Sequence, residues 1–382
     1  MSLLSFIIWS VNPEIFPNIS WLPPRWYGLL FALAFIIGMQ IYYYFYKTEG
    51  KEEKDVETLA IYIVFGTIIG ARLGHVFFYE PERFLAHPLE ILMIWKGGLA
   101  SHGAAIGIIV AVLLYCNYLI KINFNEFIFK RRKREGQGFL YVMDRIVIVV
   151  ALGGFFVRSG NFMNSEIIGI PTHSNYGVMF ARDVIDQLSY RQENIDKVFI
   201  THGSRSSESD SLKFPVDIHM VFKKGNLSED YIKAYLSNQV KRELTGYEYV
   251  KMQIREPVDR PLDYTLTKNN KGAYEAVIHT FGVPRHPAQL YEAISCLILF
   301  FFLFYLWKKR WQIMADGRIF GVFLIVVFAL RFVYEFLKEN QVPFEDKLPL
   351  NMGQWLSIPL VILGIILILR RSSHTSRIQE NQ

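Results

Sequence analysis

The sequence predicts an all-α polytopic membrane protein with a small extracytoplasmic α+β insertion. The first observation is composition, because 52% of the 382 residues are hydrophobic. The second is their distribution, since a helix needs about 20 apolar residues to cross a hydrocarbon core of about 30 Å. The third is a polar interval, residues 171–285, in which the apolar runs stop. We expect seven transmembrane helices, at residues 26–46, 58–79, 98–120, 140–158, 288–307, 318–337 and 352–370.

These stretches divide the chain into four predicted parts. Residues 1–170 contain the first four spans. They begin with a short apolar segment, Leu3–Trp9, which is followed by prolines and is interpreted as lying at the membrane interface. Residues 171–285 form the insertion, residues 286–371 contain the last three spans, and residues 372–382 form a tail.

The insertion carries signals of both strand and helix. Val216–Phe222 alternates apolar and polar residues, as a half-buried strand does, and Lys223–Asn226 supplies a turn. Ser228 is a suitable N-cap for a following helix. Gly203–Ser211 is rich in serine and charge and is interpreted as a loop. The predicted apolar face of the helix consists of Tyr231, Ala234, Tyr235, Leu236 and Val240.

Loop charges predict the orientation, because Lys and Arg are retained on the cytoplasmic side of short loops. Alternate connections carry 15 basic residues on one side and 5 on the other, which places the N-terminus outside and the C-terminus in the cytoplasm. The basic run Lys130–Arg134 also fits a nucleic-acid patch, but its position between two spans favours a topology determinant. Anionic headgroups are the simplest partners of these loops, and no nucleic-acid partner is expected. The 15 residues are Lys47, Lys51, Lys54, Lys121, Lys130, Arg131, Arg132, Lys133, Arg134, Lys308, Lys309, Arg310, Arg370, Arg371 and Arg377, and the 5 are Arg25, Arg83, Lys96, Lys338 and Lys347.

A polar cluster directly follows the fourth span. Arg158, Asn161, Asn164, Ser165 and Glu166 lie within nine residues, after a stretch with no charge. These groups can satisfy one another and still present donors to an anion. Because the cluster lies at the predicted outer end of a span, a lipid phosphate is the first ligand to consider.

Three further groups of ionisable residues lie at the same predicted level of the membrane. They are His102 within a glycine-rich segment, Arg331 with Glu335, and the run Arg285–Glu292. Ionisable groups at this depth are functional candidates by default, although Arg331 and Glu335, four residues apart, also fit a structural ion pair. Arg72, in the second span, could likewise bind an anionic headgroup or pair within the protein.

In these segments the chain resembles the bacterial prolipoprotein diacylglyceryl transferases. The family signature Arg-x-Gly-Asn-Phe-x-Asn-[Gly/Ser]-Glu-x-x-Gly is present as Arg158–Gly169. Two departures are an insertion that looks longer than usual and Val327, where some members have a tyrosine whose role would then fall to another residue, such as Tyr334. Further matches are Trp26–Gly28, Ala71–Gly74, Gly97–Gly103, Arg285–Glu292, Arg331–Phe336 and Met352–Gln354.

The resemblance implies transfer of the diacylglyceryl group of phosphatidylglycerol to the lipobox cysteine of a prolipoprotein signal peptide, with release of glycerol 1-phosphate. It also implies a multi-pass protein of the bacterial inner membrane, with an active site facing the periplasm and no cofactor. The expected catalytic residues are His102, Arg158 and Arg331. The expected substrate-binding residues are Tyr27, Arg72, Asn161, Asn164, Glu166, Gly169 and Glu335, supported by Gly98, His286, Gln289 and Tyr291.

Several alternatives remain open from the residues alone. His102 has suitable basicity to deprotonate the thiol, but nearby arginines could lower the thiol pKa without a discrete base. A transporter for an anionic solute and a noncatalytic assembly protein are the rival functions. We expect a monomer, and no metal, because His173, His202, His219 and His279 show no ligand spacing.

Overall fold

Helices and strands make up most of the described chain in this structure, which is a computed structural model. The predicted tail 372–382, Asn226 of the predicted turn and residues 204–211 of the predicted loop lie outside the described residues. The structure describes residues 6–16, 24–94, 97–123, 126–190, 192–203, 214–225, 227–268, 272–339 and 348–370.

The chain forms two compact units, and each is described by itself. The helical unit comprises Ala32–Phe156, Ser295–Arg331 and Trp355–Gln382, and the sheet unit comprises Met1–Phe31, Val157–Ile294 and Phe332–Gln354. The boundaries fall within helices, so the units do not coincide with the four predicted parts.

Six helices in the described residues are long and apolar enough to cross a membrane, as a polytopic membrane protein requires. The last turn of α11 continues as a short 3₁₀ turn, η4 (Glu335–Leu337). The six are α1 (Trp26–Thr48), α2 (Glu53–Phe78), α5 (Phe139–Met163), α10 (Ala288–Arg310), α11 (Arg318–Tyr334) and α12 (Met352–Leu369).

The helix within the predicted span 98–120 is shorter than expected. Its helix, α4, covers Ser101–Asn117, and Tyr118–Asn123 forms strand β2 of a hairpin with β3 (Glu126–Arg131). The prediction of a helix up to residue 120 was wrong, because the apolar residues after Asn117 also suit a strand. The count of seven spans therefore stays a prediction.

Glycines bring pairs of helices in the helical unit into direct backbone contact. A Cβ atom added to Gly66 would lie 2.6 Å from the carbonyl oxygen of Gly107, and one added to Gly70 would meet the carbonyl oxygen of Gly103. On α11 and α12, a Cβ at Gly321 would lie 2.9 Å from the carbonyl oxygen of Gly364. Small residues of this kind are typical of helix packing in membranes, where close approach supplies van der Waals contact.

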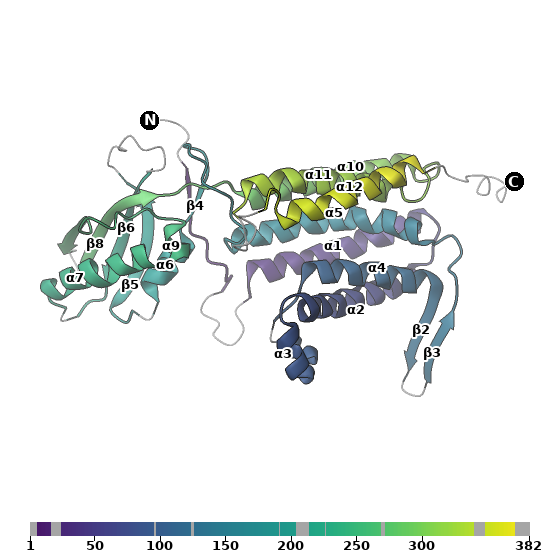
Figure 1. Ribbon diagram of the computed structural model, residues 1–382, viewed down its shortest axis with the longest axis horizontal. Coiled ribbons are helices and arrows are strands. Elements are labelled where there is room, and N and C mark those ends of the chain that lie inside the picture. Colours follow the sequence, from purple (N-terminus) through teal and green to yellow (C-terminus); the bar gives the residue numbers. More distant parts are fainter. Residues whose placement is uncertain are drawn as a thin grey trace. The chain divides into compact units, whose positions relative to one another are not determined.

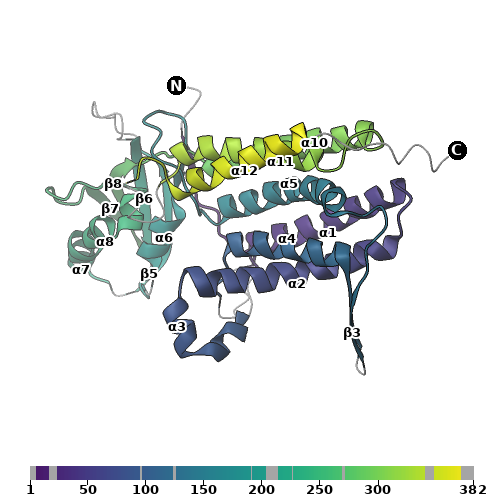
Figure 2. The ribbon, with the colours of Figure 1, turned by 45° about the vertical axis from the view of Figure 1, so that its right-hand side comes forward.

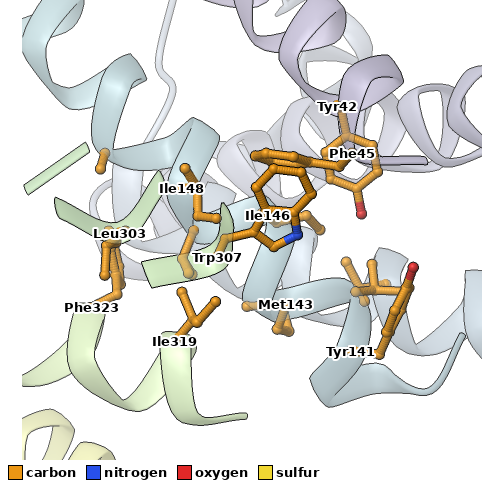
Figure 3. Close-up of a cluster of buried hydrophobic side chains, with 14 of the residues drawn as sticks. Tyr42, Phe45, Tyr141, Met143, Ile146, Ile148, Leu303, Trp307, Ile319 and Phe323 are labelled. Carbon is orange, nitrogen blue, oxygen red and sulfur yellow. The ribbon is translucent and has the colours of Figure 1, made fainter. Parts of the chain in front are cut away.

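Helix α5 runs between α1 and the group α10, α11 and α12 in both ribbon views (Figure 1, Figure 2). Its residues Ile146 and Ile148 are buried among aromatic side chains of its neighbours, including Phe45 of α1 and Trp307 of α10 (Figure 3). The rings of Phe45 and Trp307 lie 4.3 Å apart. The core of the helical unit is thus built around α5.

The same unit contains a buried polar network. Glu49 binds the guanidinium of Arg145 at 2.9 Å and accepts hydrogen bonds from Tyr141 and from Trp307 Nε1. Asp144 accepts hydrogen bonds of 2.8 Å from the backbone amides of Gly317 and Phe320 at the start of α11. These charges fall at the predicted cytoplasmic ends of the helices, where they join α1, α5, α10 and α11.

Two shorter elements follow α2 in this unit. They are α3 (Pro81–Ala86) and the 3₁₀ helix η1 (Pro88–Leu92). The prolines at the start of both elements suit a position that needs no amide donor. This connection leads to the glycine-rich segment before α4.

The sheet unit is built on a four-stranded antiparallel sheet of order β5-β6-β8-β7. Val216, Ile218, Met220 and Phe222 of β6 are buried, which confirms the predicted period-two strand. In Figure 1, α6, α7 and α9 lie against one face of this sheet. The strands are β5 (Ile195–His202), β6 (Phe214–Phe222), β7 (Tyr264–Lys268) and β8 (Tyr274–Gly282).

The helices of the sheet unit correct one prediction. Ser228 caps α7 by accepting a hydrogen bond from the amide of Tyr231, as predicted. The buried face consists of Ile232, Leu236 and Val240, whereas Tyr231 is exposed, because the true stripe repeats every four residues. The helices are α6 (Arg182–Ser189), α7 (Glu229–Tyr235), the π-helical η3 (Leu236–Val240), α8 (Lys241–Gly246) and α9 (Glu248–Lys251).

The described part of the N-terminal segment belongs to the sheet unit. Strand β1 (Ile7–Trp9) pairs in parallel with β4 (Val178–Phe180), and Phe6 is buried in the core of this unit. Ile7–Trp9 of the segment predicted to lie at the membrane interface therefore form a strand of the sheet unit.

Candidate active site

Arg158 lies in the last turns of α5 and is held by a glutamate from α10. Its Nε atom is 2.5 Å from Oε2 of Glu292, and its Nη1 atom is 3.5 Å from Oδ1 of Asn161. The arginine side chain is 26% exposed. The sequence suggested Glu166 as the counter-charge, but the described ion pair is to Glu292.

Glu166 instead organises the two predicted carboxamides. Asn161 Nδ2 donates to Oε2 of Glu166 at 3.1 Å, and Asn164 Nδ2 donates to Oε1 at 3.2 Å. Gln289 on α10 donates to the backbone oxygen of Glu166. Predicted site residues from two segments therefore converge on Glu166, the two carboxamides on its carboxylate and Gln289 on its backbone oxygen.

The backbone after α5 is strained at this point. Ser165 and Ile167 both have φ of 57°, in the left-handed region that a β-branched residue rarely adopts. Such strain persists only where the surrounding contacts enforce it, and it concentrates at functional sites. Glu166 lies between the two strained residues and is itself held by Asn161, Asn164 and Gln289.

A second acid and a lysine extend the ion pair of Arg158. Lys338 Nζ lies 2.5 Å from Oε1 of Glu292 and 3.2 Å from Oε1 of Glu335. Asn351 Nδ2 donates to Oε2 of Glu335 at 3.2 Å. The charges thus alternate along a row from Arg158 to Glu335, and the Glu335 carboxylate binds Lys338 and Asn351.

Gly169 closes the signature segment by joining two other backbone segments. Its amide donates to the carbonyl oxygen of His286 at 3.1 Å, and the next amide, Ile170, donates to Leu337 at 3.0 Å. A Cβ at position 169 would lie 2.5 Å from the His286 oxygen and 2.6 Å from the Leu337 oxygen. Only glycine fits this junction, so the structure gives Gly169 a structural role beside its predicted one.

Arg285 reinforces the same junction from inside the protein. Its side chain donates to the carbonyl oxygens of Met252 at 2.7 Å and Gly169 at 2.9 Å, and it pairs with Glu339 at 2.5 Å. It is 4% exposed. Arg285, which belongs to the predicted motif, therefore stabilises the backbone around the site.

Tyr27 and His286 each contact the signature segment. A Cβ at Gly160 would lie 2.8 Å from Cδ2 of Tyr27, so the glycine lets α1 approach α5 closely. His286 Nδ1 lies 3.2 Å from the hydroxyl of Tyr291. Burial, and to a lesser extent His173, lowers the pKa of His286, so its neutral form is favoured.

Four predicted site residues, Arg72, Gly98, His102 and Arg331, belong to the helical unit. Arg72 is buried, and its guanidinium lies over the ring of Phe84 at 4.9 Å. All three of its nitrogens donate to carbonyl oxygens between residues 90 and 98, two of them at 2.8 and 2.6 Å. Gly98, at φ of 76°, packs against Arg72 and His75. The geometry favours a structural role for Arg72 in the segment before α4 over the predicted headgroup contact.

His102 and Arg331 are both on exposed positions. His102 lies in the first turn of α4, with its ring stacked on Tyr79 at 5.8 Å and edge-on to Phe78 at 5.2 Å. Arg331 lies in the last turn of α11. Val327, one turn earlier, packs against the core of the helical unit, whereas Tyr334 lies 6.5 Å from the ring of Tyr291 in the sheet unit.

Sequence reasoning missed Glu292 and Lys338 as members of the site. Glu292 ends a motif that the sequence did single out, and Lys338 follows Glu335 by three residues. Both residues are charged and lie close in the sequence to predicted site residues at the ends of spans, and this was the signal that could have identified them. Lys338 was counted only as a loop charge.

Comparison with known proteins identifies close relatives over nearly the whole chain. The family model described as prolipoprotein diacylglyceryl transferase matches residues 14–370. A protein of Chloroherpeton thalassium called phosphatidylglycerol–prolipoprotein diacylglyceryl transferase is 33% identical over 369 residues, 96% of this chain and 95% of the relative. Proteins with the same name from Tolumonas auensis and Bacteroides fragilis are 32% and 31% identical, over 97% and 95% of this chain and 100% and 95% of their own lengths.

Proposed function

Since the chain belongs to the prolipoprotein diacylglyceryl transferase family, we propose that it transfers the sn-1,2-diacylglyceryl group of phosphatidylglycerol to the lipobox cysteine of prolipoproteins. The products are a thioether-linked lipid on the prolipoprotein and glycerol 1-phosphate. The observation that carries the proposal is the fixed position of Arg158, held through Nε by Glu292 beside the carboxamides that converge on Glu166.

The reaction is an alkylation of sulfur. A thiolate attacks the glycerol carbon, the bond from that carbon to the phosphate oxygen breaks, and the phosphate leaves with the electron pair. Arginine suits the leaving group because it stays charged and offers a planar set of donors to phosphate oxygens. Arg158 and Arg331 are the proposed phosphate ligands, and donors fixed before the reaction stabilise charge without rearranging.

The remaining predicted residues take supporting roles. Tyr27, Asn161, Asn164 and Glu166 orient the headgroup or Arg158, and Glu335 is part of the row of charges. Gly98, Gly169, His286, Gln289 and Tyr291 hold the segments that carry these side chains, and Arg72 holds the segment before α4.

His102 is the proposed base that accepts the thiol proton. Imidazole is the side chain most often used as a general base near neutral pH, which suits the deprotonation of a thiol. The stacking of its ring on Tyr79 supports a fixed orientation. Direct lowering of the thiol pKa by the arginines is the alternative.

We place the protein in the bacterial inner membrane as a monomer with seven spans, its N-terminus and active site on the periplasmic side and its C-terminus in the cytoplasm. The excess of basic residues in alternate loops supports this orientation. The bilayer supplies the lipid donor and holds the signal peptide. No nucleic acid or cofactor takes part in the proposed reaction.

The direct test is an assay with purified protein, phosphatidylglycerol and a lipobox peptide. We expect a thioether-linked diacylglyceryl peptide and free glycerol phosphate in equal amounts, and no product from a peptide with serine in place of the cysteine. Absence of product from folded, lipid-supplied protein would reject the proposal. Flux of an anionic solute across vesicles without peptide modification would favour the transporter.

A further inference from the structure

We propose that Lys338 is a positioning residue for this reaction. By binding Glu292, the lysine offsets the negative charge of this glutamate, which would otherwise neutralise Arg158 and weaken its attraction for a phosphate. The inference rests on the proposed function. It assigns Lys338 no contact with substrate. It concerns how Arg158 can be held by a glutamate and still attract a phosphate.

The two oxygens of Glu292 are divided between two cations. Oε2 lies 2.5 Å from Nε of Arg158, and Oε1 lies 2.5 Å from Nζ of Lys338. The pair with Glu292 uses the Nε edge of Arg158, whereas the phosphate would be bound by the terminal nitrogens. Glu292 therefore fixes the arginine from one side while its second oxygen is occupied by the lysine.

Lys338 is buried, with a side-chain exposure of 6%. Lysine is rarely buried unless it is paired, and here it has two acidic partners, Glu292 and Glu335. Arg158, Glu292, Lys338 and Glu335 together carry no net charge. Loss of the lysine charge would leave a net negative row beside Arg158, which would repel an anionic headgroup.

The backbone also fixes the lysine relative to the signature segment. Lys338 forms an antiparallel bridge with Gly169, and the neighbouring amide of Ile170 donates to Leu337. The segment from Arg158 to Gly169 thus fixes the positions of both cations. It carries Arg158 at one end, and at the other end Gly169 holds the backbone of Lys338, which acts on Arg158 through Glu292. This places the lysine at a defined position in the site.

The test is a double-mutant cycle on the full-length protein in detergent micelles that contain phosphatidylglycerol. We measure kcat/KM with a lipobox peptide and, separately, the equilibrium affinity for phosphatidylglycerol, which does not require turnover. We expect Lys338→Met to lower the lipid affinity and kcat/KM at least tenfold, with most of the change in KM for the lipid. Lys338→Arg keeps the charge and should stay within threefold of wild type.

The cycle then asks whether the lysine acts through Glu292. In a Glu292→Gln background, Lys338→Met should lower the lipid affinity by a clearly smaller factor than in the wild-type background, because Glu335 is then the one acidic partner among the described residues that the lysine still offsets. Lys241→Met is the matched control, because Lys241 pairs with Glu256 at 2.6 Å with 15% side-chain exposure within the insertion. It should leave lipid affinity and turnover unchanged. Thermal unfolding of every variant checks that it is folded.

Three results would overturn the inference. They are a Lys338→Met protein with near-normal lipid affinity, an equal effect of Lys338→Met in both backgrounds, and a loss in Lys338→Arg as large as that in Lys338→Met. A wild-type protein that makes no thioether product is a different result, which rejects the proposed function itself.

Discussion

Glu49 and Arg145 form a buried ion pair in which Nη2 of the arginine lies 2.9 Å from both oxygens of the glutamate. Their side chains are 1% and 3% exposed. Removing one partner of such a pair leaves an uncompensated buried charge, which typically costs about 3–5 kcal/mol. We expect Glu49→Leu to lower the free energy of unfolding by this amount, measured by denaturant or thermal unfolding in detergent.

Two controls accompany that variant. Glu49→Leu combined with Arg145→Leu should recover part of the stability, because neither charge is then left alone. Lys233→Met breaks the exposed pair of Lys233 with Glu229 and should cost less than about 1 kcal/mol. A double variant less stable than the single one would contradict the account.

Contact between α2 and α4 gives a second prediction. A Cβ at Gly107 would meet the carbonyl oxygen of Gly66, so Gly107→Ala should force the helices apart and cost about 1–3 kcal/mol. Gly153→Ala in α5 is the control, because nothing lies within 4 Å of the added atom. Equal melting temperatures for the two variants would show that the close contact does not matter for stability.

Arg158→Lys tests the planar donor set of the proposed phosphate ligand. Lysine keeps the charge but not the fork that binds Glu292 and a phosphate together. Loss of one such fixed donor is worth about 3 kcal/mol, so kcat should fall about a hundredfold. Arg182→Lys, in an exposed pair with Asp186, should have no effect on kcat. Turnover of Arg158→Lys within threefold of wild type would argue against the phosphate contact.

His102→Asn tests the base. We expect lipid affinity to be kept and turnover to fall at least a hundredfold at pH 7, because asparagine cannot accept the thiol proton. A loss that is recovered at high pH, where the thiol ionises by itself, would support the assignment. Normal turnover at pH 7 would make His102 structural.

Asp183 supplies a pH dependence in the insertion. Burial, and then Asp186, raises the pKa of its carboxyl to about 6, so the folded state favours the protonated form. The stability that this group contributes is present below pH 4 and is lost as the pH rises through about 6. Asp183→Asn should therefore be more stable than wild type by about 1–3 kcal/mol at pH 7.5, with no difference at low pH. Unfolding at both pH values checks this, and a pH-independent difference would contradict it.

The polar cluster after the fourth span could be recognised in the sequence because its members are local, and its role as a site stays a prediction. Arg158, Asn161, Asn164 and Glu166 lie within nine residues, and the structure joins the amides to the carboxylate. The helical class followed from the length of the apolar runs. The family resemblance was confirmed by matches over nearly the whole chain.

Pairings between distant segments could not be predicted. Glu292 is 134 residues beyond Arg158 in the sequence, and nothing local shows that it, and not Glu166, holds the guanidinium. The sequence left two roles open for Arg72, a headgroup contact and pairing within the protein, because nothing in it shows that the backbone carbonyl groups of residues 18 to 26 positions later accept hydrogen bonds from its guanidinium. The end of α4 was missed because an apolar stretch that continues a helix and one that begins a strand have the same composition.

The two ends of the insertion are joined where they leave the signature segment and enter α10. Thr172 donates to the carbonyl oxygen of Pro284 at 2.9 Å, and Pro171 forms an antiparallel bridge with Arg285. The two ends of the insertion are therefore paired as in a hairpin, whatever the length of the chain between them. Lengthening the insertion adds little to the entropic cost of bringing its ends together. The length of the insertion can change during evolution while Gly169 and His286 stay paired.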